Sequence, residues 1–202
     1  MKKILLAILP LALLASCGSK QERKVLVVAN GTITVQGNNI NIGDTSAGAS
    51  NFEMDIKDVT NKNLNVNNNG VKSSIPISSE GGYYILNLNN KDIYGSQLLE
   101  GRDYNNKNDL NLDEQKAMID SLKQVLAGTN ISAANKNYLI KPGQLIELSN
   151  DLEHTQVFAP FEPLSDINQP KDGKPVVLFK FYSKDELQSR LQTVEDSYNT
   201  PS

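Results

Sequence analysis

Residue types that often carry enzyme chemistry or ligand stacking are scarce in this chain. Its 202 residues include one cysteine, one histidine and no tryptophan. The single histidine, His154, excludes metal sites built from several histidines, including the HExxH helix of metalloproteases. The lack of tryptophan removes the best stacking platform for a sugar ring. A lone cysteine forms no disulfide within the chain, so a folded domain must be stabilised by its apolar core.

Sequence signatures of nucleic-acid and nucleotide chemistry are also missing. The formal net charge is −3, and the sequence contains no stripe of lysine and arginine. Both observations disfavour nucleic acid as a partner. Neither a glycine-rich phosphate loop nor a Gly-x-Ser-x-Gly nucleophile elbow occurs. His154 lies in a polar segment between Glu153 and Thr155. We therefore expect a surface histidine rather than a catalytic base, and no cofactor.

The N-terminal segment is the most informative part of the chain. Lys2 and Lys3 precede an apolar run over residues 4–14, and small residues then lead to Cys17. A charged start, a short apolar core and small residues form the order of a secretory signal. The run is too short to span a hydrocarbon core of roughly 30 Å, which needs about 20 residues.

Residues 14–17, Leu-Ala-Ser-Cys, resemble the lipobox of bacterial lipoproteins. The resemblance implies that residues 1–16 are a cleaved signal peptide and that Cys17 carries thioether-linked and amide-linked acyl chains, such as palmitate. Each buried CH₂ contributes about 0.8 kcal/mol, so two or three chains anchor a protein stably where one does not. Residues 17–24 would then be a lipidated tether, and the membrane is the first expected partner.

Three further segments are similar to uncharacterised lipoproteins of Bacteroidota, namely residues 82–88, residues 119–122 and Pro160-Phe161. In that phylum, acidic residues after the lipidated cysteine direct lipoproteins to the cell exterior. Here Cys17 is followed by Gly-Ser-Lys-Gln. The resemblance therefore implies a cell-envelope protein at the outer membrane, facing the periplasm, and it implies no known activity.

Residues 25–90 carry the alternation and turn signals of β-strands. A hairpin is predicted over residues 32–42, and Asn69-Gly70 is a strong hairpin turn. The continuous apolar run at residues 83–88 is typical of a buried strand, whereas Pro76 places its strand at a sheet edge. We therefore predict an antiparallel β-sheet or small sandwich in the first half.

Residues 91–198 have a mixed pattern. Apolar residues at helical spacing predict helices over residues 113–127 and 183–198, each with one apolar stripe. Residues 138–148 read as a hairpin around a Lys-Pro-Gly-Gln turn. The expected fold class is thus α+β, with a single domain over residues 25–198 in which sheet and helices share one core.

One loop resembles the calcium-binding loop of an EF-hand. Asp103, Asn105, Asp109 and Glu114 occupy its first, third, seventh and twelfth positions. Lys107 stands at the fifth position, where an oxygen ligand is required, and no glycine provides the sharp turn at the sixth. A positive charge repels the cation. We therefore expect no metal site and interpret the loop as a polar connection that caps the following helix.

Two other segments have both a binding and a structural interpretation. Residues 158–163, Phe-Ala-Pro-Phe-Glu-Pro, form either an exposed docking patch or a pair of phenylalanines that pin a long loop to the core, which we prefer. Residues 138–148 slightly resemble the opening of a peptidoglycan-binding LysM module. Pro160 and Pro163 interrupt the helices that such a module requires, so an ordinary hairpin is the preferred interpretation.

The expected function follows from the expected location in the cell envelope rather than from a catalytic motif. We expect a lipid-anchored cell-envelope domain that binds or scaffolds a protein or glycan and has no catalytic residues. The alternative is a periplasmic hydrolase that uses a pair of carboxylates, because any two of the 23 acidic residues could meet in the fold.

Overall fold

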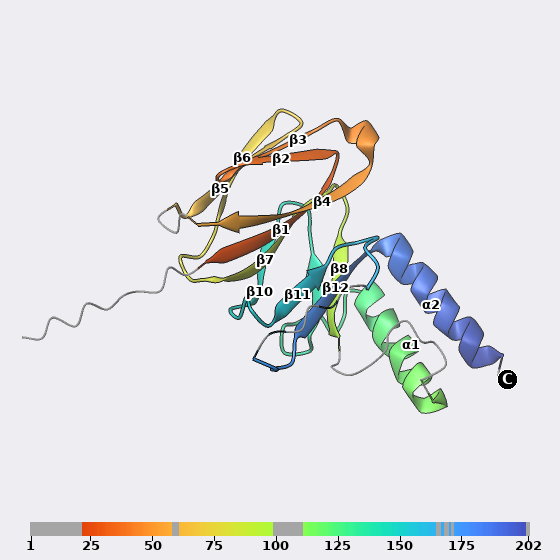
Figure 1. Ribbon diagram of the computed structural model, residues 1–202. Coiled ribbons are helices and arrows are strands. Elements are labelled where there is room, and N and C mark those ends of the chain that lie inside the picture. Colours follow the sequence, from red (N-terminus) through yellow and green to blue (C-terminus); the bar gives the residue numbers. More distant parts are fainter. Residues whose placement is uncertain are drawn as a thin grey trace, which may run out of the picture.

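The computed structural model describes residues 22–57, 61–98, 111–164, 167, 170 and 172–200. These residues form an α+β structure with three mixed four-stranded sheets, and both α-helices lie in the second half (Figure 1). The elements in chain order are β1 (Arg23–Asn30), β2 (Thr32–Gln36), β3 (Asn39–Gly43), a short 3₁₀ turn (Thr45–Ala47), β4 (Ala49–Ile56), β5 (Asn63–Asn68), β6 (Val71–Pro76), β7 (Gly82–Leu88), β8 (Ile93–Leu98), α1 (Leu112–Leu126), β9 (Asn137–Ile140), β10 (Leu145–Ser149), β11 (Thr155–Phe158), β12 (Val177–Ser183) and α2 (Lys184–Asn199).

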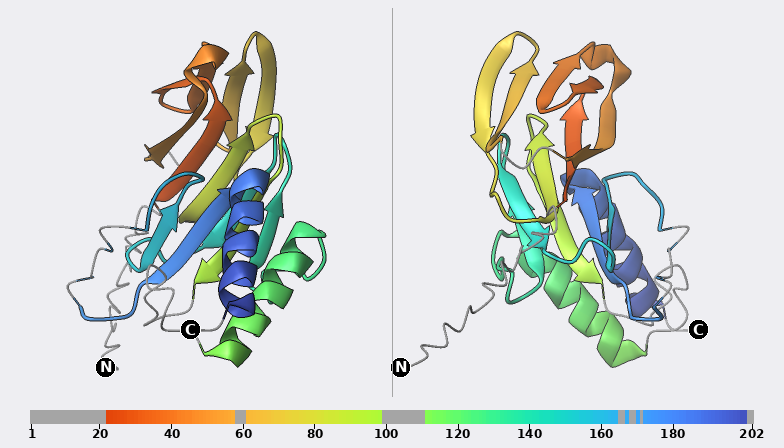
Figure 2. Two further views of the ribbon diagram at one scale, coloured as in Figure 1. Left: turned by 90° about the vertical axis from the view of Figure 1, so that its right-hand side faces the viewer. Right: turned by 60° about the vertical axis from the view of Figure 1, so that its left-hand side comes forward.

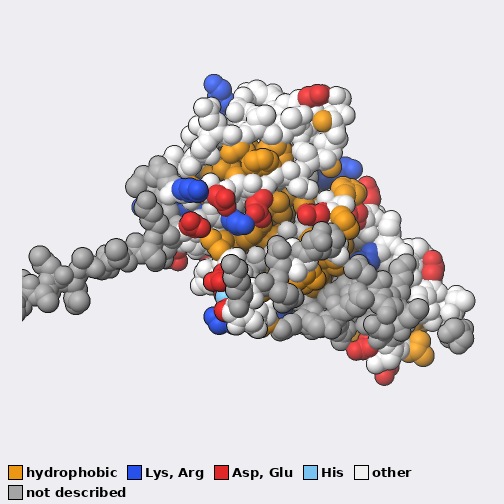
Figure 3. Space-filling view, viewed as in Figure 1, with side chains coloured by type: hydrophobic (Ala, Val, Ile, Leu, Met, Phe, Trp, Pro, Cys, Tyr) orange, Lys and Arg blue, Asp and Glu red, His pale blue; other side chains and the backbone are white. Residues whose placement is uncertain are grey.

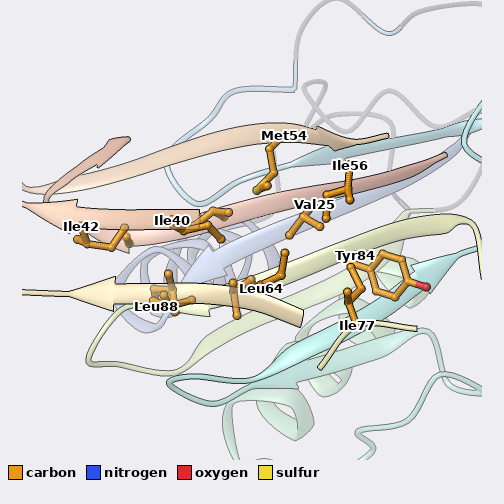
Figure 4. Close-up of a cluster of buried hydrophobic side chains, with 13 residues drawn as sticks. Val25, Ile40, Ile42, Met54, Ile56, Leu64, Ile77, Tyr84 and Leu88 are labelled. Carbon is orange, nitrogen blue, oxygen red and sulfur yellow. The ribbon is translucent and has the colours of Figure 1, made fainter. Parts of the chain in front are cut away.

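The central sheet has the strand order β10-β7-β1-β4 and is covered on both faces. Strand β1 runs parallel to β7 and antiparallel to β4. Both β1 and β7 are apolar at successive positions because each of their faces meets another layer. On one face Val25, Val27 and Leu86 pack against the outer sheet, as Figure 4 shows for Val25. On the other, Leu26 and Ile85 pack against the third sheet.

The outer sheet has the order β2-β3-β5-β6. Its inner face contributes Ile40, Ile42, Leu64 and Val66 to the core that it shares with the central sheet (Figure 4). The intervening positions of β3 and β5 are asparagines that face solvent. Because β3 and β5 pair in parallel register, these amides meet across the strands, and Asn65 Nδ2 donates to Asn39 Oδ1 at 3.1 Å. The asparagine-rich composition thus belongs to a solvent-facing sheet surface.

The third sheet, called here the helix-backed sheet, has the order β11-β12-β8-β9. One face packs on the central sheet through Phe179 and Phe181. Helices α1 and α2 pack against each other and cover the other face (Figure 2). There Tyr94 and Tyr182 meet Leu187 in a small separate cluster. The layers are therefore outer sheet, central sheet, helix-backed sheet and helices.

Local signals in the sequence account for many element boundaries. The predicted Asn69-Gly70 hairpin joins β5 and β6, with positive φ angles of 51° and 88° that suit these two residues. Pro76 lies in β6, at the edge of the outer sheet. Ser183 caps α2 through a capping box with Glu186, and Asn111 caps α1 in the same way.

Three features of the expected fold are wrong. The sheets are mixed rather than purely antiparallel, because β1–β7, β3–β5 and β11–β12 are parallel pairs. The hairpin expected over residues 138–148 does not form: β9 pairs with β8, whereas β10 pairs with β7 in another sheet. The helices do not share the core of the first-half strands; they cover only the helix-backed sheet.

The folded part begins slightly earlier than residue 25, because β1 starts at Arg23. The Arg23 side chain is fully buried, and its guanidinium donates to the carbonyl oxygens of Ser78 at 2.8 Å and Asn61 at 3.2 Å. These carbonyls flank the outer sheet at the start of β5 and after β6. Arg23 therefore ties the first strand of the central sheet to the outer sheet instead of extending a solvated tether.

Candidate functional site

A cleft of about 880 Å³ lies at one end of the central sheet. Its walls come from the end of β1, the first residues of β4 (residues 49–51), the β7–β8 turn (residues 89–92), the start of α2 and the turn at residues 160–162. Five segments of the chain thus converge on one concave surface, which is where ligand sites usually form.

The turn at the rim of this cleft presents an aromatic ring to solvent. Phe161 is 63% exposed, although it follows Phe158 and Ala159, which are buried. Its backbone is left-handed, with φ of 63°, a conformation that bulky side chains rarely adopt. Conformations of this kind persist only where the surroundings fix them, and they gather at functional sites.

Two polar side chains fix the Phe161 turn. Glu186, in the first turn of α2, accepts a hydrogen bond from the Phe161 N–H at 2.7 Å. Lys180, on β12, is almost fully buried and donates to the carbonyl oxygens of Ala159 at 2.5 Å and Glu162 at 2.7 Å. Burial lowers the pKa of Lys180, while the negative charges of Glu186 and Glu162 act in the opposite direction. The buried ammonium group of Lys180 thus stabilises, through these hydrogen bonds, the backbone turn on which Phe161 is exposed.

The cleft lining combines amides, hydroxyls and charged groups of both signs with apolar surface, and Tyr94 is its second aromatic residue. Its two serine hydroxyls are already engaged: Ser50 donates to the Gly31 carbonyl, and Ser183 caps α2. The amides and charged groups of the lining can form hydrogen bonds with a ligand, and the aromatic rings can pack against it.

His154 is not on the surface, contrary to expectation, but it does not line the cleft either. The side chain lies between two carboxylates: Nδ1 is 2.8 Å from Asp151 Oδ2, and Nε2 is 3.0 Å from Asp172 Oδ2. Hydrogen bonds to Asp172 and Asp151 raise the pKa of His154 above its ordinary 6.5. A ring protonated at both nitrogens donates to both carboxylates, and the His154 side chain in this position bridges the turn before β11 to the turn before β12.

The His154 cluster also brings two carboxylates together. The imidazole ring stands between Asp151 and Asp172, and Lys174 Nζ contacts Asp172 at 3.0 Å. A hydrolase pair needs space between its carboxyl groups for a substrate bond and a water molecule. That space is filled here by a protein side chain, so this pair is arranged as an ion cluster.

The other residues singled out from the sequence divide between described and undescribed regions. Cys17 and three of the calcium-loop candidates (Asp103, Asn105 and Asp109) lie outside the described residues. The fourth, Glu114, belongs to the capping box of α1, in which its carboxylate accepts from the Asn111 N–H at 3.1 Å. Its side chain therefore serves the helix terminus.

The Phe158–Pro163 segment has features of both roles considered from its sequence, a loop pinned to the core and an exposed apolar patch. Phe158 is buried on β11 and pins the segment to the core, whereas Phe161 is displayed at the cleft. The sequence gives no signal for this division, because it depends on Lys180 and Glu186, which lie about 20 residues further along the chain.

Comparisons with protein families, characterised proteins and solved structures found no match to this chain. The site must therefore be interpreted from its own geometry. No helix within the described ranges is long and apolar enough to cross a membrane. In the same part of the chain, no group of three or more histidine, cysteine, aspartate or glutamate side chains is arranged to hold a metal ion.

Proposed function

We propose that this protein is a lipid-anchored binding domain of the bacterial cell envelope, and that its ligand docks in the cleft beside Phe161. Three groups of evidence support this proposal. The sequence of residues 1–17 resembles a lipoprotein signal ending at Cys17. The cleft has mixed polar walls and an exposed aromatic ring at its rim. Its serine hydroxyls are engaged in structural hydrogen bonds.

The observation that carries the proposal is the constrained display of Phe161. A left-handed backbone costs an L-residue roughly 1–2 kcal/mol. The Phe161 ring is largely exposed, so it contributes little hydrophobic stabilisation in return. A buried lysine and a helix-capping glutamate nevertheless hold the turn in this form. A ring that is costly to display and is held rigidly is suited to contact with another molecule, as aromatic anchors at interfaces are.

The proposed lipid anchor determines which membrane carries this binding domain and how far the cleft lies from the membrane surface. The resemblance of residues 14–17 to a lipobox, with no acidic residue directly after Cys17, favours the periplasmic face of the outer membrane. Strand β1 begins only six residues after Cys17, and an extended chain spans at most about 3.6 Å per residue. The cleft would therefore work within a few nanometres of the membrane surface.

Site-specific photo-crosslinking tests this proposal. A photoreactive phenylalanine analogue replaces Phe161 in the full chain, and in a matched control it replaces Val71, which is more exposed but lies at the β5–β6 turn. Irradiation of intact cells should produce a discrete adduct from position 161 and none from position 71. No adduct at either position, or equal adducts at both, would contradict a binding site beside Phe161.

A further inference from the structure

Strand β4 is an edge of the central sheet. In the order β10-β7-β1-β4 it pairs with β1 on one side and with no other described strand on its outer side. It is eight residues long, and alternate residues of an edge strand direct their N–H and C=O groups away from the partner strand. Its first three residues, 49–51, also form one wall of the Phe161 cleft. The edge therefore leads from the cleft along the side of the molecule.

The two faces of β4 differ in chemistry. Phe52 shares a face with Met54 and Ile56, but it is 43% exposed while those two are buried in the core. Strand β2 packs against β4 on this side and contributes the half-buried Ile33 and Val35. An open apolar strip therefore borders β4 on its outer-sheet face.

The opposite face of β4 is acidic. Glu53 and Asp55 point there, and Glu162 of the Phe161 turn lies close enough to act with them on Tyr83. The Tyr83 hydroxyl donates to Glu53, and burial together with these three negative charges raises the pKa of Tyr83. Lys24 forms an ion pair with Glu53 at 2.7 Å, and Lys180 Nζ lies at the Glu162 turn, so this side holds three carboxylates and two ammonium groups. Figure 3 shows acidic side chains, with basic ones among them, over the region of β4, and hydrophobic areas above and below.

We infer that the outer edge of β4 accepts an extended peptide as an added strand, with apolar side chains towards Phe52 and basic side chains towards the acidic face. This inference rests on the proposed function, because the edge leads into the same cleft, and it names the ligand class. Strand addition uses backbone hydrogen bonds for affinity and alternate side chains for specificity. The apolar and acidic faces of β4 therefore select an alternating apolar and basic sequence.

The charges of β4 also disfavour pairing between the β4 edges of two copies of this chain. Antiparallel pairing of two β4 edges about Met54 would place Glu53 and Asp55 of one copy against the acidic residues of the other. Like charges directly opposite each other destabilise a strand pair. An edge strand of the outer sheet, β6, offers a comparison. It carries Lys72 and Pro76, and these residue types discourage strand addition. Strand β4 has neither a lysine nor a proline.

A defined peptide probes this surface. The probe is a fluorescein-labelled eight-residue peptide of alternating valine and lysine, and its anisotropy is followed during titration with the mature chain. Two comparison peptides replace the lysines with glutamates, or one central valine with proline, which removes a ladder N–H. The valine–lysine peptide should bind, and both comparison peptides should bind at least tenfold more weakly.

Variants of the protein locate the binding. Phe52→Ser removes an aromatic anchor and should weaken binding about tenfold or more. Asp55→Asn removes one exposed charge and should weaken it about two- to fivefold. Glu80→Gln changes an exposed acid between β6 and β7 and should have no effect. Bound peptide should also slow hydrogen exchange of the β4 amides.

Three results would overturn the inference: no binding of the valine–lysine peptide, equal binding of the glutamate peptide, or binding without protection of β4. A concentration-dependent dimer that is lost in Phe52→Ser would also overturn it, because the edge would then serve a second copy. Crosslinking from Phe161 in cells is independent of these results. If that adduct forms while the peptide does not bind, the strand-addition inference fails and the binding function stands.

Discussion

Replacement of Phe161 by glycine separates a residue displayed for binding from one needed for folding. Glycine adopts φ of 63° without strain, so the change removes a backbone cost of roughly 1–2 kcal/mol. Against this, glycine loses more entropy on folding, about 0.5–1 kcal/mol. The ring is 63% exposed, so its loss forfeits only about a third of the roughly 1.5–3 kcal/mol for a fully buried side chain. We expect the free energy of unfolding to change by less than about 1 kcal/mol.

The matched comparison is Phe158→Ala on the same segment. Phe158 is 2% exposed, and truncation of a buried phenylalanine typically costs about 3–5 kcal/mol. Thermal and urea unfolding of the two variants, followed by circular dichroism, measures both values. A loss of 3 kcal/mol or more in Phe161→Gly would refute the argument, because the exposed ring would then be part of the folded core.

Three further predictions concern the Lys180 clamp, the His154 cluster and the anchor. Lys180→Met leaves two carbonyl acceptors without their donor at about 1–3 kcal/mol each, so we expect a melting temperature at least about 4 °C lower, and an unchanged value would contradict the clamp. The pKa of His154 is raised in the folded state, so the cluster's stabilisation is full below about pH 6.5 and is lost as pH rises through the folded pKa. His154→Gln should flatten this fall in melting temperature between pH 6 and 9, and an equal slope in both proteins would exclude the cluster as its source. Cys17→Ser should move the protein from the membrane fraction to the soluble one or leave it uncleaved, and unchanged mass and fractionation would rule out lipidation.

Much of the local structure could be predicted because it depends on neighbours in sequence. The Asn69-Gly70 turn, the capping box at Ser183 and the edge position of Pro76 each follow from the chemistry of a few adjacent residues. Residues 83–88 were recognisable as a buried strand because both of their faces are apolar. These signals fix the α+β class and most element boundaries.

Strand pairing and the candidate site could not be predicted for the opposite reason. The Lys-Pro-Gly-Gln turn at residues 141–144 has good hairpin chemistry, but β9 pairs with β8 and β10 pairs with β7, in two different sheets. The exposure of Phe161 depends on Lys180 and Glu186, and the burial of His154 depends on Asp172, 18 residues away. Contacts at this separation leave no local pattern in one sequence.

The most direct test of the binding cleft is a map of where a ligand perturbs the protein. We would record backbone amide chemical shifts of the isotopically labelled mature chain while adding a detergent-solubilised envelope extract. The account predicts shifts at residues 49–51, 89–92 and 161–162, and their loss in Phe161→Gly. Shifts confined to the asparagine face of the outer sheet, or the same cleft shifts in Phe161→Gly, would contradict it.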